Sequence, residues 1–114
     1  MILITVLTVL TGLAFFIYGI SCLFSPHMKA EFERFGLPGY RRLTGMLQLM
    51  GASGLLAGLY HAPIAFYASS GLGILMLLGF ITRLKIRDGM IASSPAFIFM
   101  LINFFLAYAY SFFL

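Results

Sequence analysis

Long apolar stretches and short polar ones alternate along this chain. Four apolar stretches, residues 2–24, about 40–60, 63–82 and 95–114, pass with almost no formal charge. A helix of about 20 residues, rising 1.5 Å per residue, matches a hydrocarbon layer about 30 Å thick. The stretches lack the strict alternation of a transmembrane β-strand. The pattern therefore predicts an all-α integral membrane protein whose single domain, residues 1–114, is a four-helix bundle.

Prolines mark the predicted helix starts. Pro26, Pro63 and Pro95 each stand at a predicted first helical position, where the missing N–H leaves no hydrogen bond unmade. Ser25 is placed to cap the helix that begins at Pro26. Pro38 lies in a turn of sequence GLPG. We therefore expect no proline inside a spanning helix.

A short amphipathic helix is predicted over about residues 26–35, between the first two apolar stretches. Met28, Phe32 and Phe35 recur at helical spacing, and charged residues occupy much of the remaining surface. Gly36 is placed to end the helix. Such a helix is expected to lie in the inner-leaflet interface with its aromatic side toward the lipid. The alternative is that it packs on the ends of the first two spanning helices, and both can hold together.

The positive charge of the chain predicts its orientation. All seven Lys and Arg residues lie within residues 29–42 or 83–87, and the formal net charge is +4. Short loops rich in Lys and Arg remain cytoplasmic, so both termini are expected outside the cell membrane, which in a bacterium is the cytoplasmic membrane. Anionic lipid explains this charge better than nucleic acid does. The basic residues expected at the inner lipid surface are Arg41, Arg42, Arg83, Lys85 and Arg87.

The composition indicates that the chain lies in a membrane and excludes most kinds of catalytic site. Hydrophobic residues make up 62% of the chain and charged residues 9%, and the mean hydropathy is +1.08. With one cysteine, Cys22, an intramolecular disulfide is excluded. The two histidines, His27 and His61, fall on opposite membrane sides in the predicted topology. We therefore expect no catalytic residues, no metal site and no cofactor.

Small residues recur along the middle helices at helical spacing. Such positions let helices approach closely in lipid, where the hydrophobic effect does not drive helices together. Whether the Gly54-x-x-x-Gly58 pair meets another helix of the same chain or a second copy in a homodimer is open at this stage. The predicted helix-packing residues are Gly51, Gly54, Gly58, Ser69 and Gly73.

Gln48 is an amide within an otherwise apolar helix face. Tyr18 and Cys22 share a face of the first helix, and Asn103 lies on a face of the last. In one interpretation Gln48 packs in the bundle, hydrogen-bonded to Asn103, Tyr18 or a threonine. In the other, these four residues line an intramembrane pocket that opens from the inner leaflet, because polar groups at membrane depth often mark ligand sites.

Three motifs resemble a known family. GISCLFSP at 19–26, FGLPGYRRLTGMLQLMGASGLLAGL at 35–59 and RLKIRD at 83–88 are similar to the DoxX-like family of small four-helix membrane proteins. They resemble more distantly the animal acetylcholine-receptor assembly chaperone NACHO. The resemblance implies a four-helix membrane fold, links of some members to sulfur or quinone redox complexes, and a chaperone role in the animal branch.

The chain departs from the family pattern at three positions. Many members carry lysine where Cys22 stands, glutamate where Gln48 stands and histidine where Arg83 stands. Here a neutral pair, Cys22 and Gln48, replaces the family's ion pair, and losing both charges together avoids leaving one unpaired in a low dielectric. The departure argues against acid–base or proton-coupled chemistry at this place.

Three classes of function remain for comparison. The first is a non-enzymatic scaffold or chaperone-like protein that binds other membrane proteins or lipid. The second is an accessory subunit of a membrane redox complex that holds a quinone or lipid. The third, a small four-helix exporter, is disfavoured because the acidic residues, Glu31, Glu33 and Asp88, all lie outside the spans.

Overall fold

The computed structural model describes residues 2–86 and 89–112, without the side chains of Pro38 and of residues 90–92. The described chain is all-α, as predicted. Five α-helices and one short 3-10 helix follow one another: α1 (Ile2–Phe24), α2 (Pro26–Arg34), η1 (Pro38–Tyr40), α3 (Arg41–Ala57), α4 (Ala62–Lys85) and α5 (Met90–Ser111).

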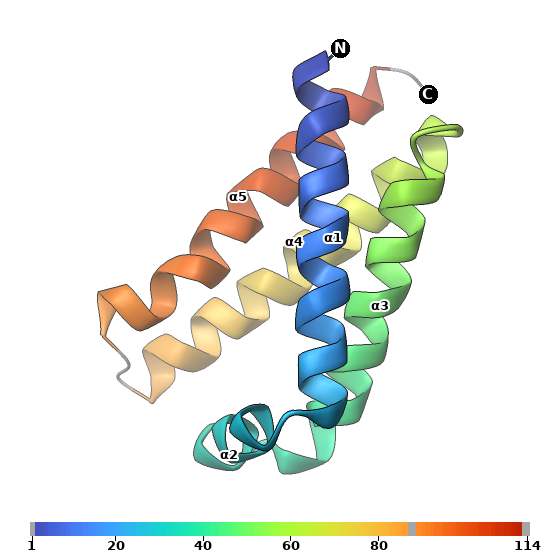
Figure 1. Cartoon of the computed structure of the whole chain (residues 1–114). Helices are drawn as coiled ribbons and strands as arrows, with labels where there is room; N and C mark the ends of the chain where they lie inside the picture. The colour runs from blue at the N-terminus through green and yellow to red at the C-terminus, as the bar shows by residue number, and fades with distance from the viewer. Residues whose placement is uncertain (1, 87–88, 113–114) are drawn as a thin grey trace.

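The four longer helices form two antiparallel pairs (Figure 1). α1 packs along α3, and α4 packs along α5. The pairs meet chiefly through α3 and α4, with a smaller contact between α1 and α5. In Figure 1 the start of α1 and the end of α5 lie at one end of the molecule, and α2 lies across the opposite end. We call these the terminal end and the α2 end.

Transmembrane helices are confirmed among the described residues. Three segments are long and apolar enough to cross a membrane: Ile2–Phe24, Ala62–Lys85 and Ser93–Ser111. The predicted span 40–60 is shorter in the structure, because η1 precedes it and a turn begins at Gly58. At 17 residues, α3 is shorter than these three segments, which have 23, 24 and 19 residues.

The prediction for the start of the last helix was wrong. α5 begins at Met90, which leaves Pro95 inside the helix. Gly89 has the extended backbone of an N-cap residue, and its carbonyl accepts a hydrogen bond from the Ser93 N–H at 3.1 Å. Pro95 then removes one bond from the helical ladder near its start.

The helix α2 ends as the sequence predicts. Gly36 has a φ of 77°, which favours glycine over residues with a Cβ. The Gly36 N–H donates to the Glu33 carbonyl at 3.0 Å, and the Leu37 N–H donates to the Phe32 carbonyl at 2.9 Å. This pair of bonds is a Schellman motif. At the other end Ser25 occupies the N-cap position, but its side chain makes no capping hydrogen bond.

Glycine brings the helices of the first pair into backbone contact. A Cβ built on Gly19 in α1 would lie 3.0 Å from the carbonyl oxygen of Gly45 in α3. A Cβ on Gly45 would in turn lie 3.0 Å from the Gly19 carbonyl oxygen. This close approach holds α1 and α3 together near the α2 end.

The two pairs meet in an apolar core with a polar contact at the terminal end. Phe15, Leu55 and Leu106 are fully buried in this core. The hydroxyl oxygens of Thr8 and Tyr110 are 2.7 Å apart and join α1 to α5. Because Thr8 also donates to the Ile4 carbonyl at 2.7 Å, its single proton is used there, and Tyr110 is the donor to Thr8.

Candidate functional site

A cavity of about 210 Å³ lies between the two helix pairs at the α2 end. In Figure 1 the end of α4 and the start of α5 lean away from α1 and α3 on this side of the molecule. The lining comes from all five α-helices: Tyr18, Ser21 and Cys22 of α1; Met28, Phe32 and Phe35 at α2; Thr44 and Gln48 of α3; Leu75, Met76, Gly79 and Arg83 of α4; Pro95, Ala96 and Phe99 of α5.

Three of the four residues proposed for an intramembrane pocket border this cavity. Tyr18, Cys22 and Gln48 line it. Asn103 does not appear in its lining and lies fully buried in α5, where its Nδ2 donates to the Phe99 carbonyl at 2.7 Å. The structure therefore brings Tyr18, Cys22 and Gln48 together and separates Asn103 from them.

Gln48 lacks the hydrogen bond that the packing interpretation expects. Its side chain is 6% exposed, and its Oε1 atom is buried without a hydrogen-bond partner. A buried oxygen of this kind is costly unless something donates to it. Because the Gln48 residue lines the cavity, a molecule held there is a candidate source of that donor.

The apolar face of α2 covers one side of the cavity. Phe32 is buried, and Met28 and Phe35 are half-buried. The rings of Phe32 and Phe35 meet edge-on with centroids 5.7 Å apart. α2 therefore packs its aromatic side on the bundle, which is the alternative that the sequence left open.

An ion pair links α2 to α4 beside the cavity. Glu31 of α2 pairs with Arg34 on its own helix and lies 4.0 Å from Nη1 of Arg83 on α4. The Arg83 guanidinium also lies 5.1 Å from the centre of the Phe35 ring. Arg83, expected at the lipid surface, thus lines the cavity and ties α2 to α4.

The other basic residues divide into two kinds. Nη1 of Arg41 donates to the carbonyl oxygens of Cys22 and Leu23, each at 2.8 Å, and so satisfies the last turn of α1. Arg42 and Lys85 are exposed. Arg87 lies outside the described residues. Lipid contact therefore stays a prediction for Arg42 and Lys85, whereas Arg41 has a structural role.

The small residues of α3 face α4 of the same chain. A Cβ on Gly58 would lie 2.3 Å from the Ala65 Cβ, and one on Gly54 would lie 2.9 Å from the Ala68 Cβ. A Cβ on Gly51 would meet the side chain of Leu72 at 2.5 Å. The question of which helix the GxxxG pair meets is thus answered within the chain.

Ser69 and Gly73 of α4 are buried as well. A Cβ on Gly73 would meet the ring of Phe104 in α5 at 2.6 Å. The Ser69 hydroxyl donates to the Ala65 carbonyl of its own helix at 2.7 Å. Gly73 therefore packs α4 against α5, and Ser69 bonds within α4.

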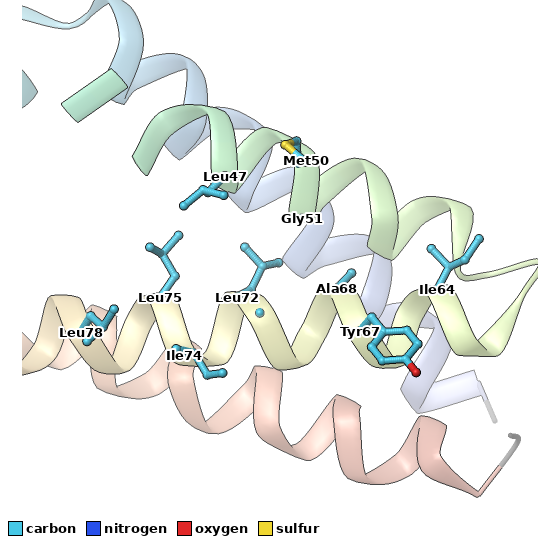
Figure 2. Close-up of a pocket in the computed structure, with 11 residues that line it drawn as sticks. Leu47, Met50, Gly51, Ile64, Tyr67, Ala68, Leu72, Ile74, Leu75 and Leu78 are labelled. Carbon is cyan, nitrogen blue, oxygen red and sulfur yellow. The ribbon is translucent and has the colours of Figure 1, made fainter. Parts of the chain in front are cut away.

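A second hollow lies on the outer face of α3 and α4 (Figure 2). It measures about 470 Å³ and is almost wholly apolar. Tyr67 on its rim is largely exposed. An apolar groove on the side of a membrane protein faces lipid tails or a neighbouring helix, and the open question of a homodimer concerns this face.

Sequence reasoning missed the contribution of α4 to the cavity. Met76, Gly79 and Arg83 recur at helical spacing and bring one face of α4 to the cavity, together with Leu75. The signal was present in the departure from the family pattern: the three positions that differ, Cys22, Gln48 and Arg83, all line this one cavity.

The walls of the cavity favour binding over catalysis. Its accessible lining is mostly apolar, and its charged member, Arg83, is paired with Glu31. Among the described residues, no three His, Cys, Asp or Glu side chains come together in a group suited to a metal ion. The arrangement suits an uncharged, mostly apolar molecule with a hydrogen-bonding group near Gln48.

Comparison with known proteins supports a single family. The family model described as the DoxX-like family matches residues 6–107, which is most of the chain. No curated protein and no solved structure matches the chain. The likeness to NACHO is not shown by these comparisons. With its transmembrane helices and this match, the chain belongs to the DoxX-like family of membrane proteins.

Proposed function

We propose that this protein is a non-enzymatic membrane protein that holds a lipid-like molecule between its helices and acts as a scaffold or chaperone-like partner of other membrane proteins. One observation carries the proposal: all five α-helices contribute to a cavity whose lining includes Gln48, a side chain with a buried, unpartnered amide oxygen. A site built from every helix couples occupancy to the packing of the whole bundle.

The size and the lining of the cavity support a ligand. Its volume is about 210 Å³, and an apolar cavity of about 150 Å³ is enough to hold benzene. Phe99 from α5 and Leu75 from α4 supply apolar wall. A lipid-like molecule can fill this space with its apolar part and still reach Gln48.

We propose α3 as the fourth span. Its 17 residues rise about 26 Å at 1.5 Å per residue, which is the lower limit for crossing a bilayer. α3 packs along α1, a helix long enough to span. Arg41 and Arg42 at its start then lie at the inner interface, with α2 beside them. Both termini lie outside the cell membrane in this topology.

Cysteine labelling tests the topology. Lys29, Lys85 and His61 are exposed, so cysteine is placed at each in turn, in a Cys22→Ser background. An impermeant thiol reagent applied to intact cells should label only the cysteine at position 61. Labelling at position 85 without labelling at position 61 would invert the topology.

Native mass spectrometry tests the binding function. The protein is purified in native lipid, and we expect a bound small molecule, with or without a protein partner or a second copy of the chain. Gly79→Leu should remove the small molecule, because Gly79 lines the cavity and has nothing within 4 Å of its built Cβ. Leucine there fills the cavity without a backbone clash.

Gly71→Leu is the matched control. Gly71 lies on the same helix and also has open space around its built Cβ, but it lines the outer groove. The control should keep the small molecule. Equal retention by both variants would place the bound molecule outside the cavity and reject the proposed site. A second copy lost only in Gly71→Leu would place a homodimer at the outer groove.

A second candidate is an accessory subunit of a redox complex that holds a quinone. The aromatic residues of the lining favour this candidate. The rings of Tyr18 and Phe99 meet edge-on with centroids 5.6 Å apart, and Phe32 also lines the cavity. Rings pack well against such walls. Retention of a quinone in native lipid would support this candidate, and retention of a phospholipid alone would support the first.

The exporter remains disfavoured on its chemistry. Proton-coupled export uses a carboxylate at membrane depth. Glu31 and Glu33 lie on the short helix α2, and Asp88 lies outside the described residues. Proton-driven uptake of a cationic dye into inverted vesicles would support the exporter, and no uptake is expected.

A further inference from the structure

We infer that the cavity recognises an uncharged molecule whose ring-sized end carries a hydroxyl group that donates to Gln48. This inference deepens the proposed function and rests on its cavity. It adds what the proposed function leaves open, namely the charge, the size and the hydrogen-bonding group of the ligand.

The hydrogen-bonding group follows from Gln48. Its Oε1 is an acceptor, it is buried, and it has no partner. Two other buried side-chain atoms share this state among the described residues, Ser93 Oγ and Asn103 Oδ1, and neither residue belongs to the cavity lining. The Gln48 oxygen therefore lacks a hydrogen-bond donor, and a hydroxyl group is one that could supply the bond.

The neighbouring polar groups leave that need to the ligand. Thr44, on the same helix as Gln48, donates its hydroxyl to the Tyr40 carbonyl at 2.8 Å. Tyr18, which also lines the cavity, is 42% exposed and does not donate to the Gln48 oxygen, which has no partner. A ligand hydroxyl in the cavity is then a natural donor to the Gln48 oxygen.

The charge of the ligand follows from the two nearby arginines. Arg83 lies 4.0 Å from the Glu31 carboxylate, and Arg41 donates to the Cys22 and Leu23 carbonyls. An anionic ligand would compete with Glu31 for Arg83, and a cationic one would meet the positive charge of Arg83 in the lining. An uncharged ligand disturbs neither arrangement.

The size of the ligand follows from the volume and the walls. The volume of the cavity is about 210 Å³. A cavity of roughly 150 Å³ holds benzene, so this one has room for a benzene-sized ring and a few further atoms. Phe32, Phe99 and Met76 line it, and aromatic rings and thioethers pack favourably against a ring. One substituted ring therefore fills the site.

A panel of small probes tests this chemistry on the full-length protein, stripped of native lipid and held in detergent micelles. The probes are 4-propylphenol, 4-propylanisole, propylbenzene, 4-propylbenzoate and the chain alcohol nonanol. Binding is measured by calorimetric titration. Gly79→Leu protein in the same micelles gives the blank for partition into detergent, because its cavity is filled.

We expect 4-propylphenol to bind the native protein about five- to tenfold more tightly than propylbenzene or 4-propylanisole, the value of one hydrogen bond. Nonanol should bind more weakly than the phenol, and 4-propylbenzoate should show no saturable binding. Gln48→Leu should still bind propylbenzene but lose the preference for the phenol. That pattern separates recognition by Gln48 from mere filling of the cavity.

Several results would overturn the inference. If phenol and propylbenzene bind equally to the native protein and neither binds Gly79→Leu, the cavity stands and hydroxyl recognition falls. Equal binding of 4-propylanisole and the phenol, both tighter than propylbenzene, would show that the ligand accepts a hydrogen bond and does not donate one. Tightest binding by the benzoate would show an anion site, and equal binding by nonanol would reject the ring. No saturable binding by any probe would reject the proposed cavity function as well.

Discussion

The two ends of the interface between the helix pairs are built differently. At the terminal end, Gly58 of α3 lies against Ala65 of α4 so closely that an added Cβ would come within 2.6 Å of the Ala65 backbone. At the α2 end the same two pairs enclose a cavity of about 210 Å³. α3 and α4 are thus in near backbone contact at the terminal end, and the two helix pairs stand apart at the α2 end, where α1 and α3 still pack closely on each other.

The difference teaches how a small bundle can be both stable and able to bind. Close packing of small residues drives helix association in lipid, where apolar side chains gain little from leaving the solvent. At the α2 end, polar links join the elements around the cavity: Arg41 bonds to the end of α1 beside the Gly19–Gly45 contact, and Glu31 of α2 pairs with Arg83 of α4. The packed end fixes the fold, and the open end keeps space for a ligand.

The largest expected effect comes from breaking the packed end. Gly58→Ala places a methyl group against the Ala65 backbone, which cannot move as a flexible side chain could. We expect a loss of about 2–3 kcal/mol in the free energy of unfolding, measured by SDS titration in mixed micelles. Gly71→Ala is the control, because a Cβ there meets nothing within 4 Å. Equal stability of the two variants would contradict the close contact.

The next effect concerns the junction of α1 and α3 at the α2 end. Arg41→Met removes two charge-assisted hydrogen bonds to the Cys22 and Leu23 carbonyls. We expect a loss of about 1.5 kcal/mol in unfolding free energy. Arg42→Met, at the exposed neighbouring position, should change stability by less than about 0.5 kcal/mol. Equal losses would show that both arginines serve only the lipid surface.

A smaller effect is expected at the hydroxyl pair of the terminal end. A double-mutant cycle of Thr8→Val and Tyr110→Phe isolates the contact across 2.7 Å. We expect a coupling of about 0.6 kcal/mol, the average for interhelical hydrogen bonds in a membrane protein. Additive losses from the two single variants would mean that the hydroxyls do not interact.

The smallest effect on global stability is expected for the ion pair on α2. Glu31→Gln removes the carboxylate that pairs with Arg83, yet partly exposed ion pairs contribute about 0.5 kcal/mol or less. The visible result should be faster protease cleavage within residues 26–37, because α2 is held less firmly. Glu33→Gln, at an exposed position of the same helix, should leave cleavage unchanged. If both variants are cleaved alike, the ion pair does not hold α2.

The all-α class and the transmembrane helices could be predicted from the sequence because surrounding lipid imposes helices on long apolar segments. Backbone groups in lipid must bond internally, so long apolar runs become helices. Gly36 was assigned correctly because its φ of 77° is a local demand that favours glycine. Pro95 was assigned wrongly, since the local rule for proline ignores Gly89, the N-cap of a helix that begins at Met90, five residues before the proline.

The candidate site was predictable only in part. Tyr18, Cys22 and Gln48 stood out as polar or thiol groups in apolar helices, and the structure places all three at the cavity. Gly79 gave no such signal, because the absence of a side chain leaves no chemical trace in a sequence. The place of Arg83 depends on how α4 crosses α2, and that crossing is set by long-range packing.

The rate at which thiols at the two ends react tests the central claim most directly. Cys22 is 2% exposed and borders the cavity, whereas Ser69 is fully buried at the packed end, where it bonds to Ala65. The reagent is the small uncharged N-methylmaleimide, applied to the native protein and to a Cys22→Ser protein carrying Ser69→Cys, with the SDS-unfolded forms as reference. The cavity should let Cys22 react at least about tenfold faster than the thiol at position 69, and Gly79→Leu should remove most of that advantage. Equal rates at the two positions, or a Cys22 rate untouched by Gly79→Leu, would contradict an open α2 end.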